Sequence, residues 1–276
     1  MTTVPDDVPA SGRARLAESR AGLFTSDLTV NEYLLVEDAG FEPLGLVLGS
    51  SIYQIGYQRQ RWTGSQELTV LSEAMYHARD LAMTRMREEA EQLGADGIVG
   101  VRLKIGGGDF GHQVTEFVAL GTAIRHRDGD TYRASDGRPF TSDLNGQDFW
   151  TLLRTGARPV GLVMGSCVYA VGRVAAMATS ARAPFRNREL PGYTQAMYDA
   201  RELAMSRMQH EAAQLGAHGV VGVELQEHRH DWDSRVTEFF AIGTAIVREV
   251  RAPREPRPAP ALTLDLNDRD GRPRIG

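Results

Sequence analysis

The sequence predicts an α+β protein built from two tandem β-α-β-β domains, each a small three-stranded sheet covered by a long helix, with an added N-terminal lead helix. The chain of 276 residues is long enough for about two domains. Its second half repeats the first, and each half orders its periodic segments as helix, strand, long helix, strand, strand. A helical crossover makes the first two strands parallel and a tight turn makes the last two antiparallel. The third strand is therefore expected at the centre of the sheet.

The repeat is visible as matched segments at two offsets. FTSDL at residues 24–28 recurs at 140–144, an offset of 116, and AMYHARDLAMTRM from Ala74 recurs as AMYDARELAMSRM from Ala196, an offset of 122. The second copy therefore carries six additional residues between Tyr169 and Ala196. A period of about 120 residues is the size of a domain, because solenoid repeats run to about 20 to 50.

Each copy is expected to open with a lead helix and continue into a buried strand. Ser26 or Asp27 is the expected N-cap, and the TVNEYLLVEDAG segment has apolar residues at helical spacing until Gly40. The segments PLGLVLGSSIYQIG and PVGLVMGSCVYAVG are continuous apolar runs rich in small residues, which is typical of a buried strand. Gly49 and Gly165 within these runs are expected to let another backbone approach closely.

The strongest periodic pattern predicts a long amphipathic helix in each copy. It is expected to stop at a Leu-Gly-Ala step, where glycine can take the left-handed C-cap conformation. GIVGVRLKI and GVVGVELQE then predict the second strand, and VTEFVALGTAI and VTEFFAIGTAI the third. The apolar positions of the two helices, spaced by three or four residues, are Met75, Ala78, Ala82, Met86, Ala90 and Leu93, then Met197, Ala200, Ala204, Met208, Ala212 and Leu215.

These segments divide the chain into five parts. Residues 1–23 are expected to be disordered, 24–127 form the first repeat, 128–139 a linker, 140–249 the second repeat, and 250–276 a flexible tail rich in Pro and Arg. PREPRPAP in the tail favours a semi-rigid extended chain. The apolar and acidic segment after it, LTLDLNDRDGRPRIG, is either a docking peptide for a protein partner or disorder.

Composition excludes several classes of function. The 31 Lys and Arg residues against 36 Asp and Glu leave a net charge of −5, so bulk attraction to nucleic acid or to an anionic membrane is not expected. No run of about 18 apolar residues predicts a membrane span. The single cysteine, Cys167, cannot form an intramolecular disulfide, and the first residues lack the apolar core of a signal peptide. The chain is expected in the cytoplasm.

Several of these segments carry a family resemblance. GLVLGSSIY, HARDLAMTRMREEAEQLGADGIVGV and VALGTAI, with their counterparts in the second copy, resemble the YbjQ-like family, which is labelled heavy-metal-binding. The resemblance covers about residues 24–126 and 140–248. It implies a small β-α-β-β domain that assembles into a pentameric ring, and no well-defined metal-ligand motif. Because five is odd, whole two-repeat chains cannot fill one such ring. Either five chains stack two rings, each of one repeat type, or the ring has another size; the pentamer of tandem chains is favoured.

The richest candidate metal site is the turn between the second and third strands of the second copy. Its HRHDWD segment carries His228, His230, Asp231 and Asp233, and the two histidines point the same way on an extended chain. No histidine recurs in both copies, so a solvated polar turn is the alternative interpretation. The sequence identifies no cofactor, and a divalent transition metal is the one candidate.

Charged residues that do recur are candidates for polar contacts between subunits. Glu116 and Glu238 open the third strand of each copy, and Arg79 and Arg201 lie on the long helices. A carboxylate beside an arginine could form a polar site at a subunit boundary, which the symmetry of a ring would repeat. The alternative is an ion pair on a helix surface, such as Arg85 with its i+4 neighbour, and a strand-end glutamate in water.

The same comparison of the two copies yields no catalytic set. No Ser/His/Asp or Cys/His/Asn arrangement recurs, and Cys167 at an apolar strand position is expected to be a buried, inert thiol. The sequence therefore favours a non-enzymatic oligomeric scaffold or binding protein, with metal or a small ligand at subunit interfaces as an open possibility. The alternative is a metal-handling or metal-responsive protein that uses the turn from His228 to Asp233.

Overall fold

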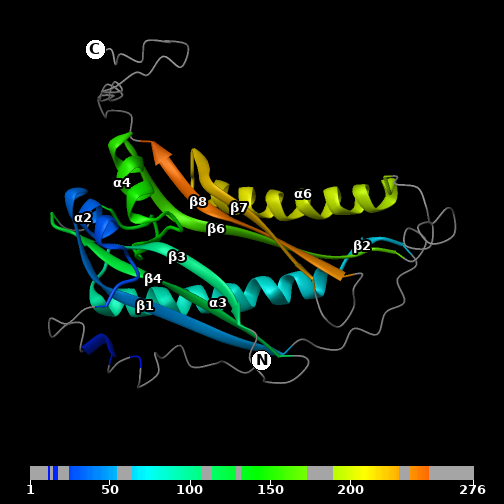
Figure 1. Ribbon diagram of the computed structural model, residues 1–276, viewed down its shortest axis with the longest axis horizontal. Coiled ribbons are helices and arrows are strands. Elements are labelled where there is room, and N and C mark those ends of the chain that lie inside the picture. The colour runs from blue at the N-terminus through cyan, green and yellow to red at the C-terminus, as the bar shows by residue number, and fades with distance from the viewer. Residues whose placement is uncertain are drawn as a thin grey trace, which may run out of the picture.

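The computed structural model of the chain describes eight stretches of residues: 12, 15–17, 25–54, 64–106, 114–128, 132–172, 189–229 and 236–248 (Figure 1). The tail expected over residues 250–276 lies outside them.

The two repeats have the same order of main elements. The first contains α2 (Val30–Asp38), β1 (Phe41–Gln54), β2 (Gln66–Glu67), α3 (Thr69–Leu93), β3 (Gly97–Gly106) and β4 (Val114–His126). The second contains β5 (Phe140–Thr141), α4 (Gly146–Arg154), β6 (Ala157–Ala170), α6 (Pro191–Gln214), β7 (Gly219–Arg229) and β8 (Val236–Arg248). The predicted α+β class of two repeated units is therefore confirmed. The connection from long strand to long helix covers residues 55–68 in the first repeat and 171–190 in the second, which is six residues longer, as the offsets predict.

Each sheet has the third long strand at its centre, as predicted, and an additional short strand at one edge. The orders are β1-β4-β3-β5 and β2-β6-β8-β7. β5 of the second repeat pairs in parallel with β3 of the first, and β2 of the first repeat pairs antiparallel with β6 of the second. The repeats therefore exchange short strands, each completing the other's sheet.

The lead helices begin later than the sequence predicts. Thr29 is the N-cap of α2 and Asn145 that of α4, so the expected N-caps, Ser26 or Asp27, were wrong. The side chains of Ser26 and Asp27 instead bind Thr122 on the central strand, β4. The hydroxyl of Ser26 lies 3.0 Å from that of Thr122, which donates to the carboxylate of Asp27 at 2.7 Å. Ser26 and Asp27 thus hold the start of the first repeat on its central strand, and polar residues suited to capping serve a tertiary contact.

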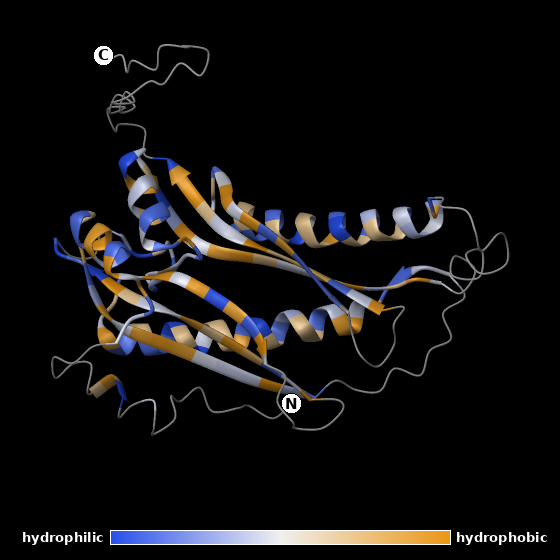
Figure 2. Ribbon diagram, in the orientation of Figure 1, coloured by the Kyte–Doolittle hydropathy of each residue, from blue (hydrophilic) through white to orange (hydrophobic). Residues whose placement is uncertain are grey.

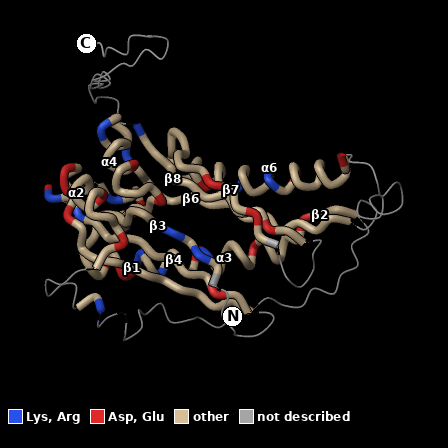
Figure 3. Tube along the Cα trace, in the orientation of Figure 1, with Lys and Arg blue, Asp and Glu red and all other residues tan. Residues whose placement is uncertain are grey.

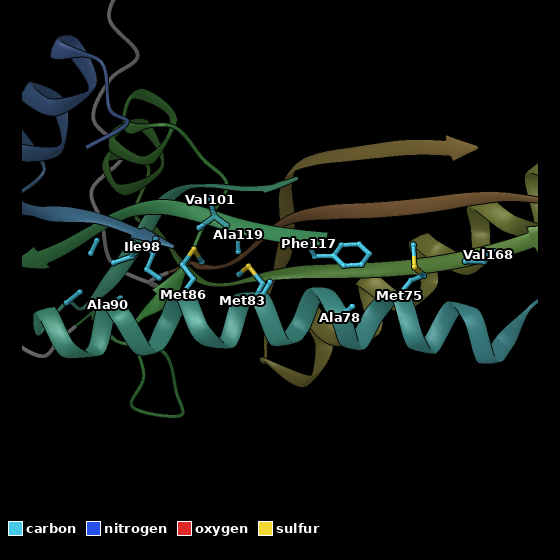
Figure 4. Close-up of a cluster of buried hydrophobic side chains, with 14 of the residues drawn as sticks. Met75, Ala78, Met83, Met86, Ala90, Ile98, Val101, Phe117, Ala119 and Val168 are labelled. Carbon is cyan, nitrogen blue, oxygen red and sulfur yellow. The ribbon is translucent and has the colours of Figure 1, made fainter. Parts of the chain in front are cut away.

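Helix α3 packs on both repeats. It covers the sheet of its own repeat and also lies along β6 of the second repeat, whereas α6 covers the opposite face of that second sheet (Figure 1). Figure 4 shows Met75, Phe117 and Val168, from α3, β4 and β6, in one apolar cluster. Strands β6 and β8 are apolar along much of their length (Figure 2), which suits strands covered on both faces. The core therefore runs without interruption from one repeat into the other.

The surface carries both signs of charge. Acidic and basic residues are interspersed in the view of Figure 3, which suits the small net charge of −5. Among the described residues no helix combines the length and apolarity needed to cross a bilayer.

Ala204→Glu is expected to disrupt the second repeat. Ala204 is fully buried where α6 lies on β6, and an unpaired carboxylate there costs several kcal/mol. The measurement is the melting temperature, with Ser206→Glu, an exposed position on the same helix, as the matched control. Equal melting temperatures for the two variants would show that the apolar face of α6 is misassigned.

Candidate functional site: the seam between the repeats

The candidate site is the seam where α3 and β2 of the first repeat lie against the sheet and helix of the second. Its first-repeat side consists of Glu67, Ser72, Tyr76 and Arg79, and its second-repeat side of Val168, Arg207, Glu211 and Glu238.

A buried ion pair lies in the middle of the seam. Arg79 on α3 donates from Nη1 to Oε1 of Glu238 on β8 at 2.6 Å, and both side chains are almost wholly buried. Ser166 Oγ donates to the same carboxylate at 2.8 Å. The guanidinium carbon lies 4.9 Å from the ring centroid of Phe117 and 4.1 Å from that of Phe240. Because a buried charge is tolerated only when it is paired, this contact fixes how the repeats fit together.

The outer edge of β6 is closed by groups from the first repeat. Leu68 N donates to the carbonyl of Val168 at 2.8 Å, and Val168 N donates to Ser72 Oγ at 2.9 Å. Arg207 Nη1 donates to Glu67 at 2.6 Å, a hydrogen bond that raises the pKa of Arg207. These contacts cover backbone groups that an edge strand would otherwise expose.

A cavity of about 220 Å³ opens along the seam beside Tyr76, Asp80, Arg87 and Glu211. Tyr76 OH donates to the Glu211 carboxylate, and Met164 N donates to its other oxygen at 2.8 Å. The cavity is smaller than the 300 to 1,000 Å³ typical of a pocket for a drug-sized ligand. It therefore has room for water or an ion, and Tyr76, Glu211 and Arg87 in its lining are already hydrogen-bonded.

Mild acid is expected to favour the seam through Glu211. Burial raises the pKa of this carboxyl above its ordinary value of 4.5, and Asp80 on α3 adds to the rise, although Tyr76, Met164 N and His210 oppose it. The folded chain therefore binds the proton more tightly than the unfolded chain. The cost of burying the carboxylate is fully present above the folded-state pKa and is lost as the pH falls through it.

The measurement is the difference in melting temperature between the wild type and Glu211→Gln, from about pH 7.5 to about pH 4.5. The difference is expected to shift in favour of the wild type as the pH falls. A difference that does not change with pH would contradict this account of Glu211.

Of the four recurring charged residues, the structure brings together Arg79 and Glu238, which come from different repeats. Arg201 on α6 lies 3.7 Å from Glu227, and its side chain is 39% exposed. Glu116 is half-buried on β4, opposite Ile52 in the register with β1. The two arginines and two glutamates thus occupy equivalent positions in equivalent elements, yet only one pair meets within a chain.

The described residues do not supply a metal site. His228 lies on β7, with Nε2 3.2 Å from the side-chain oxygen of Gln226. His230, Asp231 and Asp233 lie outside the described residues. Within the described stretches, no three His, Cys, Asp or Glu residues are grouped so that they could hold a metal ion. The part of the chain that the structure describes therefore lacks the donor set that a heavy metal requires.

The one cysteine is buried, as expected. Cys167 lies on β6 inside the core of the second repeat. Burial raises the pKa of its thiol to about 12. The thiol therefore stays protonated at neutral pH and is a poor nucleophile.

Glu67, Ser72 and Tyr76 are seam residues that were not among the predicted site residues. Their recurrence in the second copy could have identified them. Each recurs at the offset of 122 as the same residue or the same kind of side chain. The counterparts are Glu189, Thr194 and Tyr198.

Comparison with known proteins gives two kinds of match. A family model described as "Putative heavy-metal-binding" matches residues 42–127 and 154–249. A protein of Mycobacterium tuberculosis named as an encapsulin nanocompartment protein is 48% identical over 243 residues, which is 88% of this chain and 91% of the relative. Shorter relatives match one repeat. A UPF0145 protein of Halorubrum lacusprofundi is 41% identical over 91 residues, which cover 31% of this chain and 86% of that relative. A UPF0145 protein of Pseudothermotoga lettingae is 34% identical over 89 residues, which cover 30% of this chain and 82% of that relative. The two UPF0145 proteins therefore match the length of about one repeat.

Proposed function

The chain belongs to the YbjQ-like family in a tandem form, and on that premise we propose that it is a non-enzymatic scaffold that assembles into a homo-oligomer and associates with an encapsulin nanocompartment. The observation that carries the assembly is the seam. It joins two different surfaces, the helix side of the first repeat and the sheet side of the second. The helix side of the second repeat and the sheet side of the first repeat are not used by the seam. If the same contact forms between chains through these two surfaces, its repetition closes a ring or extends a filament.

The arrangement of the repeats limits the kind of ring that whole chains can form. Five chains of 30.3 kDa would weigh about 152 kDa and three about 91 kDa. Two stacked rings of one repeat type each would require every lateral contact to join identical repeats, whereas α3 already lies on the sheet of the other repeat. This contact favours a single ring in which the repeats alternate. Any number of whole chains then gives an even number of repeats, and five chains would give ten.

The nanocompartment proposal rests on the Mycobacterium tuberculosis relative, which is named for that assembly. In this chain we assign the contact with the shell to the C-terminal tail. The composition of PREPRPAP predicts a stiff spacer, and LTLDLNDRDGRPRIG after it supplies apolar side chains suited to a complementary surface. A cytoplasmic location suits a chain whose one cysteine is buried and unpaired.

Deletion of residues 250–276 is expected to abolish co-purification with an encapsulin shell protein, because it removes the proposed docking segment. The measurement is co-expression with that shell protein, followed by isolation of assembled shells and detection of the scaffold. A chain with residues 262–276 in scrambled order is the matched control for length and composition, and it too should fail to co-purify. A full-length chain absent from the shells would contradict the nanocompartment proposal. Equal recovery of all three chains would contradict the assignment to the tail.

The description of the family favours metal handling as a second candidate function, with His228, His230, Asp231 and Asp233 as the proposed ligands. Elemental analysis of the purified chain and of the variant His228→Ala/His230→Ala separates the two candidates. Metal handling requires about one transition metal per chain, lost in the variant. The scaffold proposal expects the same oligomer from both proteins, with no stoichiometric metal.

A further inference from the structure

We infer that the seam recurs between copies of the chain, with α6 of one copy on the β1–β4 face of the next and Arg201 of one copy paired with Glu116 of a second copy. This inference rests on the proposed homo-oligomer and names the surfaces that build it. The second copy contributes one half of the ion pair, so the site is incomplete within one chain.

The surfaces that would form this contact are open, and their counterparts within the chain are closed. Leu48 and Ile52 on β1 are 41% and 56% exposed, whereas the equivalent Met164 and Val168 on β6 are buried under α3. On α6, Tyr198 is 57% exposed. Within the part of the chain that the structure describes, an apolar strand face and a helix with an exposed aromatic side chain thus lack the cover that the intrachain seam gives their counterparts, although Arg15 reaches Glu89 beside them.

The two open surfaces also match in chemistry. Each contact of the intrachain seam has a counterpart pair with side chains of the same kind, one on each open surface. Arg79 with Glu238 corresponds to Arg201 with Glu116, Tyr76 with Glu211 to Tyr198 with Glu89, Glu67 with Arg207 to Glu189 with Arg85, and Ser72 with Val168 to Thr194 with Ile52. Four independent contacts that retain both partners favour a second copy of this chain over any unrelated partner.

The backbone register supports the same docking. Ile52 stands opposite Glu116 as Val168 stands opposite Glu238. The N–H and C=O of Val168 point away from β8, toward Ser72 and Leu68. By the same register those of Ile52 point away from β4, because hydrogen-bonding direction alternates along an antiparallel ladder. β1 is an edge strand, so its outer edge can receive the segment before α6 as β6 receives β2.

The pairing of β5 with β3, which lies at the other end of the intrachain seam, also has a possible counterpart between copies. β5 lies beside β3, where Val101 is buried, whereas the equivalent Val223 on β7 is 44% exposed. Thr25 to Leu28 is the first-repeat counterpart of the segment that begins with β5. Residues 25–28 of one copy are therefore placed to lie along β7 of another copy, in the same contact that joins α6 to β1.

The carboxylate of Glu89 has room for the second copy. Leu48 N donates to Oε2 of Glu89 as Met164 N donates to Oε2 of Glu211, and Arg15 donates to the same Oε2 of Glu89. Tyr76 donates to the other oxygen, Oε1, of Glu211. Tyr198 of a second copy is therefore placed to donate to Oε1 of Glu89.

The test reverses the charges of the pair. Arg201→Glu and Glu116→Arg are each expected to raise the dissociation constant of the assembly at least about thirtyfold, because each leaves a like-charge pair in a closed interface. The double variant exchanges the two charges and is expected to recover most of the wild-type affinity. Asp199→Arg is the matched control and should assemble normally, because Asp199 is exposed on α6 and its first-repeat counterpart, His77, is exposed and does not line the seam cavity. Sedimentation velocity over a concentration series measures assembly, and circular dichroism checks the fold.

The outcomes separate the inference from the function on which it rests. If the wild type is oligomeric and the single variants assemble equally well, the copies meet through another surface and the inference is overturned, while the scaffold proposal stands. A double variant no better than the single variants would equally overturn the pairing. A wild type that is monomeric at every concentration would contradict the proposed homo-oligomer itself.

Discussion

Glu238→Ala is expected to destabilise the folded chain by about 3–5 kcal/mol, because it leaves the Arg79 guanidinium buried without its carboxylate. The rings of Phe117 and Phe240 and the carbonyl of Met75 remain beside the guanidinium, and they cannot replace a full negative charge. Chemical denaturation measures the effect as a lower midpoint at an unchanged slope.

Two matched variants show whether the loss comes from the uncompensated charge. Glu42→Ala removes a half-exposed ion pair with Arg125 and is expected to cost at most about 1 kcal/mol. Arg79→Met/Glu238→Leu replaces the buried pair by apolar side chains and is expected to recover most of the stability. A Glu238→Ala variant as stable as Glu42→Ala would mean that the seam is not closed around the ion pair.

Gly165→Ala is expected to cost about 2–3 kcal/mol through overpacking of α6 on β6. A Cβ at this position would overlap the carbonyl oxygen of Ala204 and lie 2.7 Å from Met208 N, and neither backbone atom can move without shifting the helix. The measurement is the free energy of unfolding from a denaturant series.

Two further glycine variants test whether close packing causes this loss of stability. Gly49→Ala should give a similar loss, because its Cβ would overlap the Ala82 carbonyl in the same way on α3. Gly64→Ala, with no atom within 4 Å of the added Cβ, is expected to change stability by no more than about 0.5 kcal/mol. Comparable effects at all three positions would contradict close packing as the cause.

The long elements were predictable because each carries enough periodic residues to bury a face. Both halves repeat the same pattern: six apolar positions in each long helix, twelve in all, and continuous apolar runs in the strands. The helices and strands predicted in one half therefore support those predicted in the other. The close approach at Gly49 and Gly165 followed from the absence of a side chain within a buried strand.

The short elements and the helix starts were not predictable in the same way. β2 and β5 have two residues each, too few to show any period, and their pairing partners belong to the other repeat. Ser26 and Asp27 have the chemistry of N-caps, and only the tertiary position of Thr122 diverts them. Local sequence carries no information about such long-range partners.

The residues of the seam were predictable in part: the sequence marks which residues are candidates, and only the structure shows which of them meet. Recurrence marked Arg79, Arg201, Glu116 and Glu238 as candidates for a polar contact at a boundary. Which arginine meets which glutamate depends on how one repeat lies on the other, and sequence period does not specify this. Tyr76 recurs as Tyr198 but resembles an ordinary aromatic residue of a helix until Glu211 is placed beside it.

The most direct test of the central claim, that the seam within a chain is repeated between chains to close a ring, is the native mass of the intact protein at micromolar concentration. The account predicts one discrete oligomer whose mass is a whole multiple of 30.3 kDa, about 91 kDa for three chains or about 152 kDa for five. A stable monomer of 30.3 kDa would contradict the claim, and so would an unlimited series of ever larger species, because the contact would then not close.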